Sequence, residues 1–111
     1  MADTTIGPYV MGEKPPPLVY QYLDSAGAAI NLTGYTATIR VQRTDADTYA
    51  EFTATVTEPL LGKVSHTWTG AEFTSAGDHW LEFWTGNTVN RYASVRLKAS
   101  VRLPVGPVPA L

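Results

Sequence analysis

The chain contains no cysteine, and this absence removes several kinds of chemistry at once. Without thiols it has no disulfide framework, no thiolate nucleophile and no cysteine-based zinc or iron–sulfur site. It also has no apolar run near the roughly 20 residues that a membrane-spanning helix needs. Residues 1–5 lack the basic and apolar regions of a secretory signal. We therefore expect a protein that folds in a reducing cytoplasm and binds no membrane.

Charged side chains are scarce as well, at 16% of the 111 residues, and the net charge is −2. A field of this sign does not attract a polyanion. The short basic series Arg96, Lys98 and Arg102 lies on one side of an expected strand, which is typical of a solvated face. We expect no nucleic-acid partner.

Histidine is limited to His66 and His79, so few residues could serve as a catalytic base. A hydrolytic triad needs a base that a carboxylate orients toward a nucleophile. His66 falls on the apolar side of an expected strand, which favours a core residue, and His79 follows Asp78 where another strand begins. We expect no enzymatic activity.

Acidic residues in the middle of the chain raise the question of a cation site, because hard ions bind several converging oxygens. The run Asp45-Ala46-Asp47 lacks the later glycine and the bidentate glutamate of a calcium loop, and the polar tip of a hairpin explains it better. No glycine-rich phosphate loop opens a helix either. We therefore expect no metal and no cofactor.

Alternation with a period of two is the main pattern that the sequence does contain, and it indicates strands with one buried face. It is clearest over residues 35–43 and 50–57, where threonines and charged residues alternate with apolar ones. Further strands are predicted over residues 18–23, 63–68, 79–85 and 89–103. The last is longer than one strand normally lasts, so we expect it to bend, change sheets or project beyond the domain.

Six or seven short strands separated by turn signals predict an all-β fold. We expect an immunoglobulin-like antiparallel β-sandwich of about seven strands over residues 18–103, and a small closed barrel is the alternative. One short helical turn is expected after the strand at residues 63–68, because Thr69 and Glu72 have the spacing of a capping box.

Both ends of the chain are rich in proline, which favours extended backbone and excludes a central strand. We predict an extended N-terminal arm over residues 1–17 and a C-terminal tail over residues 104–111. Stiff arms lose little entropy when they bind. We therefore expect their prolines to contact partner proteins, namely Pro15, Pro16, Pro17, Pro104, Pro107 and Pro109.

The aromatic residues allow two interpretations, a sugar-stacking platform on one sheet or a core between sheets, and the core is favoured. Tyr92 falls on the polar phase of its long strand, so it is the best candidate for an exposed aromatic contact with a partner. The set comprises Tyr35, Trp68, Phe73, Trp80, Trp84 and Tyr92.

The order of several short motifs resembles the immunoglobulin-like domains at the N-terminus of tailed-phage baseplate upper proteins and related tail or head-fibre proteins. The motifs lie within residues 18–95, and they are LDSAG at 23–27, INLTGY at 30–35, GKVS at 62–65 and AGDHWLEF at 76–83. The resemblance implies a virion protein that is assembled in the host cytoplasm. Such proteins usually continue into a fibre or receptor-binding region, whereas this sequence ends at Leu111, so we expect a standalone subunit.

Two functions follow as hypotheses. The first is a structural bacteriophage protein of the tail, baseplate or capsid surface, present in many copies or as a homo-oligomer, that binds other virion proteins. The second is a β-sandwich module that binds cell-surface carbohydrates through exposed aromatic residues. Loss of glycan binding on Tyr92→Ala would favour the second.

Overall fold

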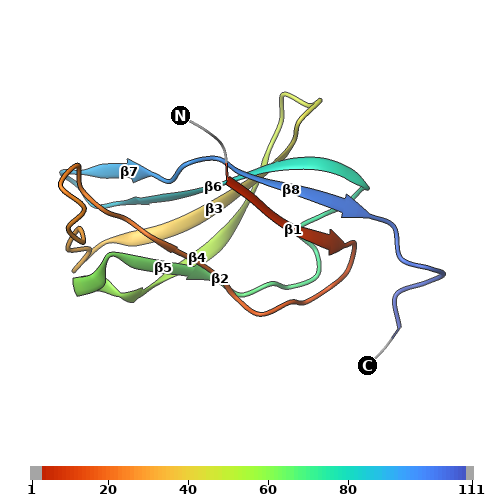
Figure 1. Ribbon diagram of the computed structural model, residues 1–111, viewed down its shortest axis with the longest axis horizontal. Coiled ribbons are helices and arrows are strands. Elements are labelled where there is room, and N and C mark those ends of the chain that lie inside the picture. The colour runs from red at the N-terminus through yellow and green to blue at the C-terminus, as the bar shows by residue number, and fades with distance from the viewer. Residues whose placement is uncertain (1–3, 110–111) are drawn as a thin grey trace.

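The computed structural model describes residues 4–109, and their regular structure is β-strand apart from one 3₁₀ turn (Figure 1). The all-β prediction is therefore confirmed, and no helical turn forms at Thr69–Glu72. The strands are β1 (Thr4–Val10), β2 (Leu18–Gln21), β3 (Thr36–Arg43), β4 (Ala50–Glu58), β5 (Lys63–His66), β6 (Gly77–Gly86), β7 (Arg91–Ala93) and β8 (Leu97–Arg102), with the turn η1 (Pro59–Leu61) after β4.

The strands form one curled sheet in the order β1-β8-β6-β3-β4-β5-β2, and β7 pairs with β6 beside β8. Every pairing between strands is antiparallel except that of β1 with β8, which is parallel. The sheet is therefore mixed, and the prediction of a purely antiparallel arrangement is corrected. The reason is that β1 lies within the segment 1–17, which the prolines had marked as lying outside the sheet.

The curl is visible in the connection between β1 and β2. These two strands are consecutive along the chain, yet they lie at opposite ends of the strand order. Tyr9 of β1 nevertheless packs against Trp68, which follows β5 near the other edge, with ring centroids 5.0 Å apart. The two edges of the sheet therefore lie close to one another, and the core fills the space between them.

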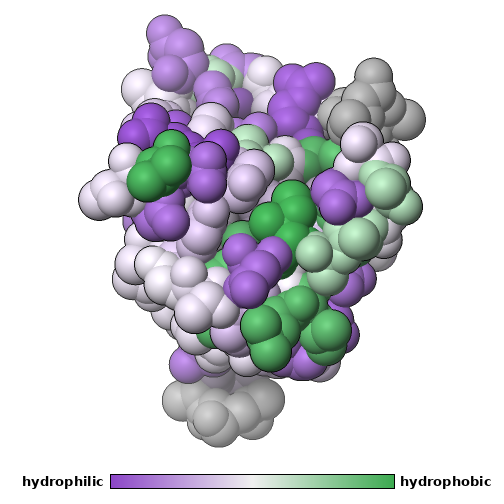
Figure 2. Space-filling model, turned by 90° about the vertical axis from the view of Figure 1, so that its left-hand side faces the viewer, coloured by the Kyte–Doolittle hydropathy of each residue, from purple (hydrophilic) through white to green (hydrophobic). Residues whose placement is uncertain are grey.

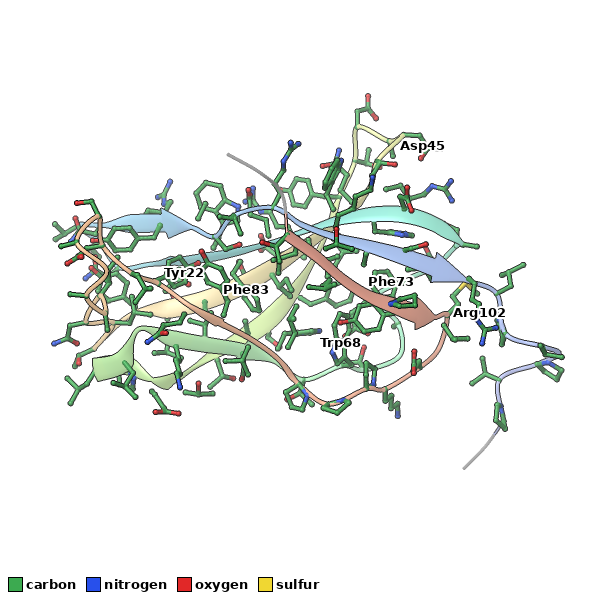
Figure 3. All side chains as sticks on the ribbon, in the orientation of Figure 1. Tyr22, Asp45, Trp68, Phe73, Phe83 and Arg102 are labelled. Carbon is green, nitrogen blue, oxygen red and sulfur yellow. The ribbon has the colours of Figure 1, made fainter. Side chains whose placement is uncertain are left out.

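The core follows the alternation of the central strands β3 and β6, which pair over eight residues. Ile39 faces inward opposite Phe83, and neither side chain is exposed. Tyr22 points toward Phe83 from the other side of the curl (Figure 3), and its hydroxyl donates a hydrogen bond to the Phe83 carbonyl at 3.1 Å. The buried apolar residues are Tyr22, Leu32, Ala37, Ile39, Val41, Val64, Trp68, Phe73, Leu81, Phe83, Leu97, Ala99 and Val101.

The long C-terminal strand is interrupted, as its length suggested. Ala93 pairs with Trp84 and Leu97 pairs with Leu81, so this strand advances four residues while β6 advances three. The extra residue is a bulge, and it reverses which residues face the core. Ser94 stabilises the bulge, because its Oγ accepts a hydrogen bond from the Phe83 amide at 2.9 Å.

The N-terminal segment is partly integrated into the sheet. β1 belongs to it, and the Tyr9 ring of β1 lies 5.0 Å from the Trp68 ring and 5.8 Å from the Phe73 ring, measured between centroids. Figure 3 shows Trp68 and Phe73 close to β1. Residues 1–3 of the predicted arm lie outside the described residues.

The C-terminal segment leaves the sheet after β8 and has no regular structure over residues 103–109. Figure 1 shows it extending from the end of β8 and then turning back. Val108 contacts Gly12 closely, since a Cβ atom added to Gly12 would lie 2.7 Å from Cγ2 of Val108. Residues 110–111 lie outside the described part of the chain.

Candidate functional site

The solvent-facing side of β3, β6, β7 and β8, which we call the outer face, carries two tryptophans together with arginines. On β6 the odd-numbered residues from His79 to Thr85 are buried, while Trp80, Glu82 and Trp84 are half-buried on the opposite side. On β3 the outward residues include Thr38 and Arg40. A strand that alternates in this way places its two tryptophans where a ligand or partner can reach them.

The outer face is organised in rows of residues that pair across the strands. Thr36, Gly86 and Arg91 form one row, and the next row contains Trp84 beside Thr38. Because Gly86 has no side chain and Thr36 is small, the surface is hollowed between Trp84 and the β6–β7 turn. An open groove of about 850 Å³ results, lined by Gly34, Thr36, Ala37, Thr38, Arg40, Trp84, Thr85, Gly86, Asn87, Thr88 and Arg91.

Trp84 is held in place from two sides. Its indole Nε1 donates a hydrogen bond of 2.6 Å to a carboxylate oxygen of Glu82. The guanidinium carbon of Arg40 lies 5.3 Å from the ring centroid, within the range of a cation–π interaction. Arg40 also stacks on Tyr49 at 4.6 Å and pairs with Glu51 at 3.0 Å. These contacts orient the ring before any ligand binds.

Trp80 extends the outer face toward β8. The guanidinium of Arg96 lies 4.4 Å from the Trp80 ring centroid, and the ammonium of Lys98 lies 5.6 Å from it. A smaller depression separates this pair from Trp84, and Glu82 and Gln42 contribute to its lining. Tryptophan and arginine in alternation are enriched where proteins bind partners.

The charges of the groove are of one sign. Arg40 and Arg91 line it, and none of its lining residues is acidic. The nearest carboxylates are engaged, Glu51 with Arg40 and Glu82 with Trp84. Within residues 4–109 the exposed Arg91 side chain makes no hydrogen bond or ion pair, so its charge is available to a ligand.

Tyr92 lies on the inner side of β7. Its ring stacks on Tyr35 with centroids 6.1 Å apart and is tilted against Tyr22 at 6.3 Å. The alternation of residues 89–103 assigned Tyr92 to the polar phase, and the bulge before β8 is what reverses that phase. Arg91 and Ala93 occupy the outward positions instead.

The prolines predicted to contact partners are distributed over two places. Pro15 is half-buried and Pro16 and Pro17 are exposed, all in the connection between β1 and β2. Pro104 is half-buried at the start of the C-terminal segment, and Pro107 and Pro109 are exposed further along it. Only Pro104 and Pro109 of these six line the groove between the C-terminal segment and the turn at residues 10–14.

The histidines are engaged in structural hydrogen bonds. His66 faces the Thr53 carbonyl through Nδ1 at 2.8 Å and the Glu72 carboxylate through Nε2 at 2.6 Å. His79 faces the Gly77 carbonyl through Nδ1 at 3.0 Å, and burial lowers its pKa, against the opposing effect of that hydrogen bond. Across residues 4–109 no three His, Asp or Glu side chains are grouped to hold a metal, and no helix is long and apolar enough to cross a membrane.

Nothing in the sequence alone marks Trp84, Arg40 and Arg91 as a group. A usable signal was present for the tryptophan, because Trp80, Glu82 and Trp84 share a phase and a glutamate favours solvent. The two arginines lie on strands that are more than 40 residues apart in the sequence. Only the pairing of β3 with β6 and of β6 with β7 brings them together. No protein-family model matches this chain, and none of the curated proteins is significantly similar to it.

Proposed function

We propose that the protein is a non-enzymatic structural subunit of a bacteriophage virion, built on an immunoglobulin-like sandwich, that binds neighbouring virion proteins in a multi-copy assembly. In this proposal the subunit belongs to the tail, the baseplate or the capsid surface. Three features support this proposal, namely the strand order, the exposed C-terminal segment and an apolar end of the molecule.

The strand order supports the immunoglobulin-like part of the proposal. Immunoglobulin domains pack a sheet of strands A, B, E and D against a sheet of strands C, F and G. The series β2-β5-β4 matches B-E-D, and the series β3-β6-β8 matches C-F-G. In this interpretation β4 passes from one sheet to the other, and β1 extends the second sheet beside β8.

The exposed C-terminal segment is the observation that carries the assembly function. Val105 is 97% exposed, and Leu103 and Val108 are also largely in solvent. Three prolines in this segment limit its freedom in the unbound state, so binding it in a neighbour costs less entropy than binding a flexible peptide. An apolar, stiff segment outside the sheet is well suited to fill a groove on an adjoining subunit.

A second apolar region lies at the opposite end of the molecule, near η1 and the loop after β2. Leu23, Leu60 and Leu61 are exposed there. Figure 2 views this end and shows apolar side chains gathered among polar ones. Contacts at two ends would allow one copy to bind two neighbours.

The proposal is tested by mass spectrometry of gradient-purified particles of the phage or prophage that encodes the chain. We expect the protein in stoichiometric amounts, and Val105→Asp to reduce its incorporation strongly. Val89→Asp is the matched control, since Val89 is 82% exposed outside this segment. Absence of the wild-type protein from the particles, or equal incorporation of both variants, would count against the proposal.

Carbohydrate binding is the second candidate function, and the outer face is the observation that favours it. A saccharide needs a flat aromatic surface together with polar groups that fix its hydroxyls. Trp84 and the threonines of the groove provide both. A glycan array probed with the full chain tests this function, and loss of binding on Trp84→Ala would assign it to the outer face.

A further inference from the structure

The groove beside Trp84 differs from an ordinary sheet surface in its shape. Gly34 and Gly86 remove two side chains from its floor, and Thr36 contributes only a short one. Gly86 is required there, because a Cβ atom at this position would lie 2.9 Å from the Asn90 carbonyl oxygen across the turn. The hollow is thus part of how β6 and β7 are joined, and it exists without a ligand.

The groove also offers hydrogen-bonding groups rather than apolar pockets. Thr36, Thr38, Asn87 and Thr88 line it, and Trp84 is its only large ring. Peptides are normally bound by an unpaired strand edge or by pockets for apolar side chains. Apolar pockets are missing from this groove, because Ala37 and Trp84 are the only apolar side chains among its lining residues, whereas a sugar ring can lie flat on Trp84 and bond to the threonines.

Arg91 adds a charge requirement to this geometry. It lies in the row next to Trp84, on the far side of Gly86 from Thr36. Arg40, at the other side of Trp84, is already paired with Glu51. A guanidinium without a partner in the described chain binds a carboxylate through two parallel hydrogen bonds.

From these observations we propose that the groove is a binding site for an acidic saccharide, with a sugar ring on Trp84 and its carboxylate on Arg91. The proposal rests on the second candidate function, which it makes specific. Thr36 and Thr38 bond the sugar hydroxyls, and Arg40 holds the indole ring in position from the side of Tyr49. Saccharides without a carboxylate bind more weakly at this site.

The test begins with an array that carries uronic-acid, sialic-acid and neutral oligosaccharides, probed with the full chain. Binding is then followed by NMR on isotope-labelled protein with tri-galacturonic acid and with its methyl ester, which has the same sugars without charge. We expect the acid to shift the Trp84 indole and the amides of β6 and β7. The ester should bind about tenfold more weakly, because it lacks the negative charge that pairs with Arg91.

Two variants separate the site from general charge effects. Arg91→Gln should weaken binding of the acid about tenfold and leave the ester unchanged. Arg102→Gln is the matched control, since Arg102 is exposed at the far end of β8 beside the C-terminal segment (Figure 3), and it should bind like wild type. Trp84→Ala should abolish binding of both sugars.

Equal affinity for the acid and the ester would overturn the acidic specificity while leaving carbohydrate binding intact. Failure of every array saccharide to bind would overturn both the proposal and the second candidate function. If a hexaglutamate peptide bound more tightly than any acidic saccharide and depended on Arg91, the groove would be a peptide site and the proposal would be wrong. None of these results bears on the incorporation of the chain into virions.

Discussion

The Nε2 atom of His66 lies 2.6 Å from a carboxylate oxygen of Glu72, and both side chains are almost completely buried. Glu72 also accepts hydrogen bonds from the backbone amides of Thr69 and Gly70 at 2.8 and 3.0 Å. The pair fastens the loop between β5 and β6 to β5, and Trp68 and Phe73 of that loop complete the core beside β1. The loop therefore depends on a buried hydrogen-bonded pair of polar side chains.

Replacement of Glu72 by glutamine should destabilise the protein strongly. The Glu72 carboxylate bonds to the His66 ring and to the amides of Thr69 and Gly70, and the amide nitrogen of a glutamine cannot accept a hydrogen bond as the oxygen it replaces does, so a buried hydrogen bond is lost. Leaving a buried hydrogen-bonding group unsatisfied in this way costs about 1–3 kcal/mol. Urea unfolding at pH 7 measures the loss, and Glu58→Gln, an exposed carboxylate 4.0 Å from Lys63, is the control. A change below about 1 kcal/mol would contradict the role given to the pair.

The same carboxylate predicts how stability depends on acid. Burial raises the pKa of Glu72, but hydrogen bonds from the Thr69 amide and the His66 ring outweigh this effect, so the pKa lies below its ordinary value. A group with a lowered pKa in the folded state contributes stability above its unfolded pKa and loses it as the pH falls through the folded pKa. We expect the free energy of unfolding to fall below about pH 4.3, and the difference between wild type and Glu72→Gln to shrink there. A difference that stays constant down to pH 3 would be inconsistent with this linkage.

The hydroxyl of Tyr22 connects the edge of the sheet after β2 to β6. It donates to the Phe83 carbonyl at 3.1 Å and accepts from the Thr85 hydroxyl at 3.2 Å, in the core. Tyr22→Phe leaves the buried Thr85 hydroxyl without this partner, and we expect a loss of about 1–2 kcal/mol in thermal or urea unfolding. Tyr49→Phe is the control, because Tyr49 is exposed.

Wild type and Tyr22→Phe should also differ in how their stability changes at alkaline pH. Burial, opposed in part by the Thr85 hydrogen bond, raises the pKa of Tyr22 to about 12. A raised pKa gives stability that is present below the unfolded value of 10.0 and is lost as the pH approaches 12. Unfolding at pH 9 and pH 11 should show a larger loss for wild type than for Tyr22→Phe. Parallel losses in the two proteins would show that Tyr22 does not ionise on unfolding.

Strand existence could be predicted from the sequence because a buried core imposes a period of two, and the alternation around Ile39 is a direct consequence. Which side of the sheet Tyr92 faces could not be predicted. One extra residue between β7 and β8 reverses the alternation, and no residue type in the sequence signals that residue. β1 was missed for a different reason. Gly7 and Pro8 discourage a strand locally, while pairing with β8 and the packing of Tyr9 on Trp68 override that preference. Trp84 was recognised as one of several aromatic residues, but its arginine neighbours depend on long-range pairing.

Ser94 should prove necessary for the bulge that reverses this phase. Its Oγ accepts the Phe83 amide at 2.9 Å and donates to the Val95 carbonyl at 2.8 Å. Ser94→Ala leaves a buried amide without an acceptor, which costs about 1–3 kcal/mol. Hydrogen exchange should show faster exchange of the Phe83 amide in the variant, whereas Ser100→Ala, at an exposed position of β8, should leave it unchanged. Unaltered protection of Phe83 would mean that another group can replace the serine.

The contact between Gly12 and Val108 positions the C-terminal segment, and it can be tested without changing that segment. Gly12 has a φ of +86°, and a Cβ atom there would lie 2.7 Å from Cγ2 of Val108. Gly12→Ala therefore adds both backbone strain and a collision. Gly27→Ala adds only the strain, since Gly27 has a φ of +83° and no atom within 4 Å of an added Cβ. Backbone strain should cost each variant about 1–2 kcal/mol of stability. Gly12→Ala should lose more because of the collision, and it alone should shift the methyl resonances of Val108. Identical Val108 spectra in the two variants would show that the segment does not contact the turn at residues 10–14 in solution. The segment could then bind a neighbouring subunit without first being released from that turn.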